Sequence, residues 1–200
     1  MNLGLNDKVI IVTGGAKGIG EGIAKLLASE GAVSVIVGRN EADNIHTVQA
    51  IEAVDGKAFQ VRAELSLPAE CEMAVIKVVE KFGRIDGLVN NAGVNDGVEK
   101  FIASLHKNVV HYYLMAHHSL PYLKESKGSI VNISSKTAET GQGNTSAYAA
   151  ANGGRNALTR EWAVELLKYG IRVNAVVVAE CFTPLYQSWI QTFDEPQTKL

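Results

Sequence analysis

The sequence has few of the features that direct a chain to an oxidising compartment, a nucleic acid or a membrane surface. Its 200 residues include only two cysteines, Cys71 and Cys181. They lie far apart and form no ligand cluster, so we expect reduced thiols, as in the cytoplasm. Lys and Arg number 19 against 21 Asp and Glu, for a net charge of -2. Without a basic excess, neither nucleic acid nor an anionic membrane is an expected partner.

Long hydrophobic runs are also lacking. The apolar stretches, such as Val9–Val12 and Ala175–Ala179, are far too short to span a bilayer. Met1–Lys8 has no charged segment followed by an apolar one. We therefore predict no signal peptide and a cytoplasmic location.

Short apolar runs rich in Val and Ile alternate with longer helical patterns. The predicted strands are Val9–Thr13, Val33–Val37, Ala58–Val61, Gly87–Asn90, Ser129–Ile133 and Ile171–Val177. The predicted helices are Gly18–Glu30, Glu41–Ala53, Pro68–Phe82, Phe101–Leu123 and Ala147–Tyr169, the last with Leu158, Trp162, Val164 and Leu166 on its apolar face. Strands without polar alternation are typical of a sheet covered on both faces. The pattern predicts an α/β fold, a doubly wound parallel sheet (Rossmann fold) in three α/β/α layers, as one domain over residues 1–200.

A glycine-rich loop lies where the first strand meets the first helix, and reads Thr13-Gly14-Gly15-Ala16-Lys17-Gly18-Ile19-Gly20. Glycines let the backbone turn tightly and approach a pyrophosphate, while the helix N-terminus offers free N–H groups and a partial positive charge. At this junction the loop predicts a dinucleotide site, with Gly14, Lys17, Gly18, Ile19 and Gly20 as cofactor contacts.

The end of the second strand bears on cofactor choice. Dinucleotide folds usually place an acidic residue there to hold the ribose hydroxyls, but this chain has Gly38 followed by Arg39. Two cations near the ribose, Lys17 and Arg39, favour a 2′-phosphate and hence NADP(H). NAD(H) stays open, because both cations can also be ordinary solvated charges.

Four motifs in order carry a family resemblance. The glycine loop is followed by Asn90-Asn91-Ala92-Gly93, Ser134-Ser135 and Tyr148. Together they resemble the short-chain dehydrogenase/reductase family through nearly the whole chain. Further stretches are similar to the L-fucose dehydrogenases and related bacterial sugar dehydrogenases of that family. They are Asn90 to Gly97, Ser134 to Thr137, Thr140 to Ser146 and Leu158 to Ala163.

The resemblance implies roles for individual residues. Tyr148 is the implied general acid/base, Ser135 the hydrogen-bond partner of the same substrate oxygen, and Asn108 the holder of a proton-relay water. Asn90, Ala92 and Gly93 are implied to line the adenosine and ribose side of the cofactor, with Glu64 and Leu65 at the adenine. Thr183 is implied to reach the nicotinamide carboxamide. In this chemistry the cofactor carries the hydride, and the protein orients the substrate and moves the proton.

The chain departs from the family at the motif Tyr-x-x-x-Lys. The sequence reads Tyr148-Ala149-Ala150-Ala151-Asn152, and residues four apart share a helix face, so Asn152 occupies the lysine position. That lysine binds the nicotinamide ribose, and its charge favours the ionised phenol. Asn152 keeps the hydrogen bonding without the charge. At an effective dielectric of about 20, a unit charge about 5 Å away is worth roughly 3 kcal/mol. We expect Lys136 to replace this charge in part; Arg155 is another nearby cation.

Other departures concern the end of the sixth strand and the length. Val178-Ala179 stands where the family usually has Pro-Gly, and Glu180 follows. The segment between Gly93 and Asn108 is shorter than usual. After Thr183 we expect the usual last strand and substrate lid to be lacking.

The candidate substrate pocket is polar. Asn95, Gln142, Glu180 and Trp189, with Lys136, are its candidate residues, because each buried sugar hydroxyl needs a hydrogen-bond partner. The leading hypothesis is oxidation of an L-fucose-like aldose to a lactone. A carbonyl reductase of another small substrate, or a cofactor-binding protein with weak catalysis, are the alternatives. No metal is expected, since the histidines of Phe101–Leu123 lack carboxylate or cysteine partners at ligand spacing. The family also implies a homotetramer or homodimer through the last two predicted helices.

Overall fold

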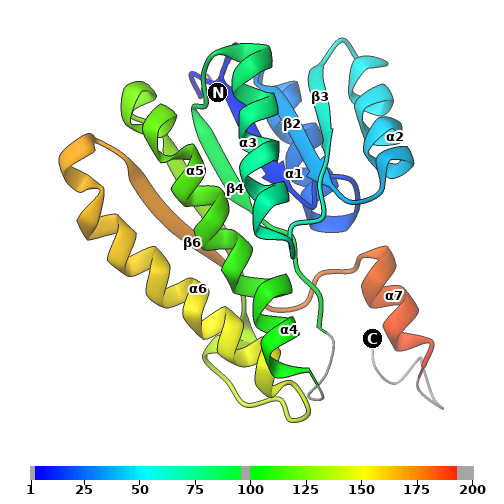
Figure 1. Cartoon of the computed structure of the whole chain (residues 1–200). Coiled ribbons are helices and arrows are strands. Elements are labelled where there is room, and N and C mark those ends of the chain that lie inside the picture. Colours follow the sequence, from blue (N-terminus) through cyan, green and yellow to red (C-terminus); the bar gives the residue numbers. More distant parts are fainter. Residues whose placement is uncertain (1–2, 96–99, 193–200) are drawn as a thin grey trace.

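The computed structural model describes residues 3–95 and 100–192. Asp96 and Gly97, which end one of the stretches quoted above, lie outside these ranges. Six strands form one parallel sheet in the order β3-β2-β1-β4-β5-β6 (Figure 1). They are β1 (Val9–Thr13), β2 (Val33–Gly38), β3 (Lys57–Arg62), β4 (Gly87–Asn90), β5 (Ser129–Ser135) and β6 (Arg172–Val178). The strand order reverses between β1 and β4, where ligands bind in doubly wound folds.

Helices cover the sheet from both sides, as the alternating pattern predicts. One apolar cluster joins β1 and β2 to α1 (Gly18–Ser29) and α2 (Glu41–Glu52). The other joins the opposite face of the sheet to α3 (Pro68–Phe82), α5 (His111–Ser126) and α6 (Ser146–Glu165), which lie side by side in Figure 1. The predicted three-layer Rossmann fold is therefore confirmed.

The predicted helix Phe101–Leu123 is divided in the structure. It consists of α4 (Phe101–Leu105), a π-helical turn His106–Val110 and α5. The π turn inserts one extra residue per turn, and such turns often occur at functional sites. The apolar pattern does not reveal it, because the added residue changes the backbone without changing the residue types.

Two predictions about burial are wrong. Val164 is 76% exposed rather than part of the apolar face of α6, whose Trp162 and Leu166 are buried. In β6, Val176 and Val177 are 51% and 47% exposed, so this strand is not covered on both faces by the described residues. Apolar composition alone does not supply a neighbouring element. After β6, the short helix α7 (Pro184–Ile190) follows, and no helix of the described part has the length and apolarity needed to cross a bilayer.

Candidate active site

A cleft of about 660 Å³ runs along the carboxyl ends of the strands. Residues that follow β1, β2, β3 and β4 line one part of it, and the ends of β5 and β6 with α7 line the other. Most of the predicted site residues meet here: Gly14, Lys17, Gly18, Ile19, Gly20, Arg39, Glu64, Leu65, Ala92, Gly93, Ser135, Tyr148 and Thr183. Residues that lie far apart in the sequence are thus brought to one cavity.

The glycine loop has the geometry that a pyrophosphate needs. Gly14 and Gly18 adopt backbone φ angles of +63° and +57°, which residues other than glycine rarely adopt. A Cβ on Gly20 would lie 2.2 Å from the carbonyl oxygen of Gly14, so only glycine lets α1 begin against the loop. The N-cap residue Lys17 makes no side-chain cap, which leaves the first N–H groups of α1 for a ligand. These residues fit a nicotinamide dinucleotide.

Charged pairs surround the expected ribose region. Lys17 pairs with Asp43 at 2.7 Å, and the largely exposed Arg39 lies 3.9 Å from Glu64. Partial burial opposes ionisation of Glu64, but hydrogen bonds from Ser66 and the charge of Arg39 leave its pKa below the usual value. Gly38 offers no carboxylate, and a Cβ there would lie 2.6 Å from Asn44 Oδ1.

The Asn90-Asn91 motif ties the ends of two strands together. The buried Asn90 donates to Tyr112 O at 3.3 Å and to Asn132 Oδ1 at 3.1 Å, so it lies behind the cleft rather than in it. Asn91, which does line the cleft, donates through Nδ2 to Thr13 O at 2.9 Å. The backbone N–H of Asn91 donates to Thr13 Oγ1, also at 2.9 Å. The motif therefore ties β1 to β4 beside the cleft, with Asn90 buried behind it and Asn91 in its lining.

Ser135 and Tyr148 both line the cleft. Ser135 is the last residue of β5, and its Oγ accepts a hydrogen bond from Thr137 N at 3.3 Å. Tyr148 lies in the first turn of α6. Thr183 caps α7 by accepting from Tyr186 N at 3.2 Å and packs at the position of Gly18, so the chain after β6 returns to the glycine loop.

Asn108 lies in the π turn and is fully buried. Its Oδ1 accepts from Val94 N at 2.8 Å, and its Nδ2 donates to Val94 O at 2.9 Å. Asn108 thus fixes the segment after Gly93 and does not itself line the cleft. Its predicted role as holder of a relay water stays a prediction.

Asn152, at the lysine position of the motif, also lies behind the cleft. It is fully buried, and its Nδ2 donates to Tyr148 O at 2.8 Å, within its own helix. Its Oδ1 accepts from Arg155 Nη1 at 2.9 Å. The expectation that Asn152 hydrogen-bonds a ribose finds no support in this geometry, because its amide is engaged on both sides and Arg155 lines the cleft instead.

Sequence reasoning gave Arg155 only a passing role, although it is a prominent residue of the cleft wall. Its Nε donates to Asn108 O at 2.5 Å and its Nη1 to Ile133 O at 3.0 Å. The guanidinium carbon lies 4.2 Å from the ring centre of Tyr112 and 6.0 Å from that of Tyr148. A signal existed, because Arg155 follows Tyr148 by seven residues, which is two helical turns and the same face.

The predicted substrate residues lie outside the lining of the cleft. Lys136 and Glu180 form an ion pair with each other, each partly exposed, between the ends of β5 and β6. Asn95 and Gln142 are exposed, and Trp189, on α7, is 43% exposed. The structure thus brings Lys136 and Glu180 together near Ser135, but the five predicted substrate residues do not form one pocket.

His111 is a cleft residue that no motif indicated. Burial, with a smaller effect from the charge of Arg155, lowers the pKa of its imidazole to about 3. Its Nε2 lies 3.0 Å from Lys107 O. His111 is therefore neutral at physiological pH. Among the described residues, no three His, Cys, Asp or Glu side chains are grouped as a metal site requires.

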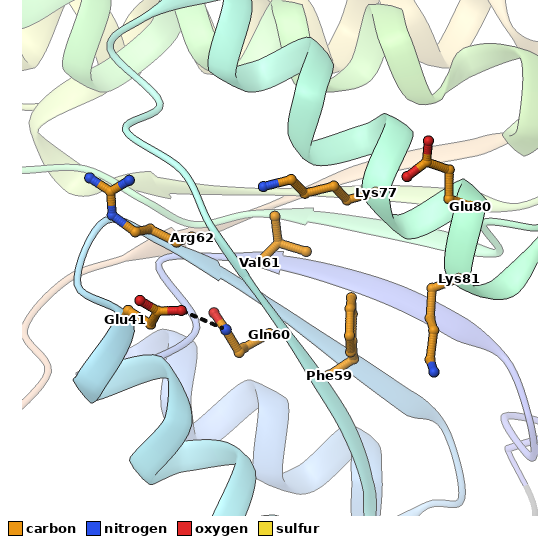
Figure 2. A pocket seen from close by; sticks show the side chains of 8 residues that line it. All are labelled: Glu41, Phe59, Gln60, Val61, Arg62, Lys77, Glu80 and Lys81. Atoms are coloured by element: carbon orange, nitrogen blue, oxygen red, sulfur yellow. Dashed lines mark hydrogen bonds between the residues drawn. The ribbon is translucent and has the colours of Figure 1, made fainter.

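A second hollow of about 400 Å³ lies at the edge strand β3, between α2 and α3 (Figure 2). It mixes charges of both signs around the ring of Phe59, and Gln60 Nε2 donates to Glu41 Oε1 at 3.4 Å. Phe59 packs edge-on against Phe82. None of the predicted site residues lines this hollow, so the cleft is the candidate active site.

Comparison with known proteins gives the family. The family model described as short chain dehydrogenase matches residues 8–193. This chain belongs to the short-chain dehydrogenase/reductase family. It is 30% identical over 203 residues to L-fucose dehydrogenase of Rattus norvegicus, covering 98% of this chain and 74% of that protein. It is 35% identical over 199 residues to levodione reductase of Leifsonia aquatica, covering 94% and 74%.

Solved structures agree with the family assignment. The crystal structure of Cj0485 dehydrogenase superposes with a TM-score of 0.92 at 43% identity, covering all of this chain and 78% of that one. The resemblance stated from sequence is thereby confirmed, as is an oxidoreductase acting on alcohol or carbonyl groups. The family binds nicotinamide cofactors, and the similar structures include one with NADPH and one with NAD.

Proposed function

We propose that this protein transfers a hydride between a nicotinamide cofactor and the hydroxyl or carbonyl group of a small polyhydroxylated substrate. The observation that carries the proposal is the cleft in which Ser135 and Tyr148 lie together with the glycine loop. When bound, the nicotinamide ring supplies or accepts the hydride. The chain itself must then hold the substrate oxygen and move its proton.

Two side chains are suited to these tasks. Ser135 Oγ accepts from Thr137 N, which orients the hydroxyl group at the end of β5 so that its own proton is free for a substrate oxygen. Tyr148 exchanges the proton with that oxygen as general acid or base, a role worth about a hundred- to ten-thousandfold in rate. Asn108 holds Val94, a residue of the cleft lining, through two hydrogen bonds with its backbone.

NADP(H) is the proposed cofactor. Arg39 is 81% exposed at the side chain and stands at the end of β2, where the absence of a carboxylate at Gly38 removes the usual ribose ligand. A guanidinium binds phosphate through two parallel hydrogen bonds. The Lys17–Asp43 pair partly neutralises the second cation, so Arg39 is the residue on which the preference depends.

The proposed substrate is an aldose similar to L-fucose, oxidised at the anomeric hydroxyl to a lactone. Lys136 and Glu180 offer donors and acceptors beside Ser135, and Gln142 lies in the polar segment that leads to Tyr148. Each sugar hydroxyl removed from water needs such a partner. The similarity to L-fucose dehydrogenases over most of the chain adds to this argument.

The test is reduction of NADP⁺ and NAD⁺, followed by the absorbance of the reduced cofactor, with L-fucose, other aldoses, an alditol and a cyclic alcohol. We expect turnover with aldoses, a lactone product and a higher kcat/KM with NADP⁺. Tyr148→Phe should lower kcat by at least about a hundredfold while cofactor binding is retained. Tyr122→Phe, at a partly buried tyrosine of α5 that does not line the cleft, is the matched control.

Turnover of ketones or their alcohols, without turnover of aldoses, would replace the proposed sugar by another small carbonyl substrate. Cofactor binding without turnover of any alcohol or ketone would indicate the weakly catalytic alternative.

We also propose a homodimer or homotetramer through α4, α5 and α6. Large apolar side chains are exposed on these helices: Phe101, Ile102, Tyr113 and Val164. Light scattering on the preparations used for the assay measures the mass, and a monomer would contradict the proposal.

A further inference from the structure

The buried cation beside Tyr148 comes from a position where the family motif has none. Arg155 lies three residues after Asn152 and is 3% exposed, yet it lines the cleft. An arginine keeps its charge in proteins, so the wall next to Tyr148 carries a permanent positive charge.

Neutral groups fix the guanidinium in place. Nε donates to Asn108 O at 2.5 Å, and Nη1 donates to Ile133 O at 3.0 Å and to Asn152 Oδ1 at 2.9 Å. Gly93 leaves the space that this arrangement requires, because a Cβ there would lie 2.8 Å from Arg155 Nη2. Asn152 therefore acts as a support for Arg155.

The charge of Arg155 is not cancelled by an ion pair. Within residues 3–95 and 100–192, no carboxylate lies within ion-pairing distance of the guanidinium. Lys136, in contrast, is paired with Glu180 and is more exposed, at 39% of its side chain. A buried unpaired charge acts over several ångströms with little screening, whereas an exposed pair does not.

We propose that Arg155 supplies the positive charge that the motif lysine supplies elsewhere in the family, and that it stabilises the ionised phenol of Tyr148 during oxidation. Arg155 is thus a positioning residue that acts through Tyr148, and the inference rests on the proposed role of that tyrosine. The guanidinium carbon lies 6.0 Å from the ring centre, and a unit charge at that distance, at an effective dielectric of about 20, is worth roughly 3 kcal/mol.

The other titratable groups near this wall are neutral, exposed or engaged in an ion pair. On α5, burial holds the pKa of His111 at about 3 and raises the pKa of Tyr112 well above its usual value, so both are neutral in the assay range. Lys107, in the π turn, also lines the cleft. After β5 and β6, Lys136 is paired with Glu180, and Glu139 accepts from Asn156 at 2.7 Å. Arg155 remains the buried charge that faces the Tyr148 ring.

The experiment compares Arg155→Gln, Arg155→Lys and the double variant Asn152→Lys/Arg155→Gln with the wild type. Two quantities are measured: the pH midpoint of kcat/KM for alcohol oxidation, and the pH midpoint of phenolate absorbance in the cofactor-free protein. Subtracting the titration of the matching Tyr148→Phe protein isolates the phenolate of Tyr148. Arg160→Gln, at an exposed arginine of the same helix, is the control, and Lys136→Gln tests the competing cation.

We expect Arg155→Gln to raise both midpoints by about one to two pH units and to slow oxidation about ten- to hundredfold at neutral pH. Arg155→Lys and the double variant, which restore a cation, should return both midpoints toward the wild-type values. The controls should leave the midpoints in place. If Arg155→Gln does not fold, the wild type and the double variant, which place a cation at two different positions, are compared by the same titration.

Unmoved midpoints in Arg155→Gln, or a Lys136→Gln protein that shifts them instead, would overturn the proposal, as would a double variant whose midpoints stay at those of Arg155→Gln. If Arg155→Gln does not fold, a double variant titrating well above the wild type overturns it equally. The phenolate titration needs neither cofactor nor substrate, so a wrong substrate assignment does not affect it. Loss of the sugar activity with an intact titration shift would reject only the proposed function.

Discussion

A methyl group at Gly20 should separate the phosphate loop from the helix that follows it. A Cβ at this position would lie 2.2 Å from Gly14 O and 2.5 Å from Asn91 Nδ2. Ordinary contacts of this kind need roughly 3.5 Å, so the loop or the start of α1 must move by about 1 Å. Forcing such a group into a packed site costs about 1–3 kcal/mol of folding free energy.

The same displacement should weaken cofactor binding. The N–H groups at the start of α1 and the turn at Gly14 would no longer converge on one anion. The loss of one hydrogen bond to a charged group costs about 1.5–3 kcal/mol. We therefore expect Gly20→Ala to raise the Kd for NADPH by about ten- to hundredfold.

Gly22→Ala is the matched control, because it lies in the same helix, is exposed, and a Cβ there would meet no atom within 4 Å. Replacing a helical glycine by alanine there should stabilise the protein by up to about 1 kcal/mol and leave the Kd unchanged. Urea unfolding gives the stabilities, and quenching of intrinsic fluorescence gives the Kd. A Gly20→Ala protein with wild-type stability and affinity would refute the steric argument. Lost stability with unchanged affinity would show that α1 does not hold the pyrophosphate.

Two further predictions concern charge. Arg39→Ala should raise the Kd for NADPH by about tenfold or more and leave the Kd for NADH nearly unchanged. An equal increase of both Kd values would contradict a 2′-phosphate contact. Arg62→Ala, at the end of β3, is the control. The pKa of His111 falls from 6.5 in the unfolded chain to about 3 in the fold, so below pH 6.5 the unfolded state binds the extra proton and stability decreases as the pH falls. Urea unfolding between pH 7 and 5 should show a slope of up to about 1.4 kcal/mol per pH unit that is reduced in His111→Asn; an equal slope in that variant would contradict the assignment.

The sequence predicted the layered fold well, because each strand and helix carries its own local pattern. The bounds of β1, β4 and α3 agree with the prediction, and most other elements differ by one or two residues at their ends. The apolar pattern did not predict the π turn at His106–Val110, where Asn108 accepts a hydrogen bond from Val94, a residue distant in sequence. The exposure of Val176 in β6 likewise depends on what packs against the sheet, which local sequence does not specify.

The sequence predicted where the candidate site lies in the fold better than it predicted which side chains point into the site. The motifs placed the glycine loop, Ser135 and Tyr148 in one cleft because parallel strands end at the same edge of a sheet. They did not show that Asn90 and Asn152 turn away from that cleft, since a motif gives a position along the chain and says nothing of the rotamer.

At the lysine position of the motif, the residue type in the sequence does not determine the charge near the catalytic tyrosine. Replacing lysine by asparagine removes a charge from one residue, but the field at the phenol depends only on the distance to a cation and on its burial. On a helix, residues 148, 152 and 155 share one face, so a cation can move by three residues and stay beside the same ring. The long arginine side chain then reaches the wall that Gly93 leaves open, and the shorter asparagine accepts its hydrogen bond. A lost motif residue therefore argues for lost chemistry only after the neighbouring turn of the helix has been searched for the same charge.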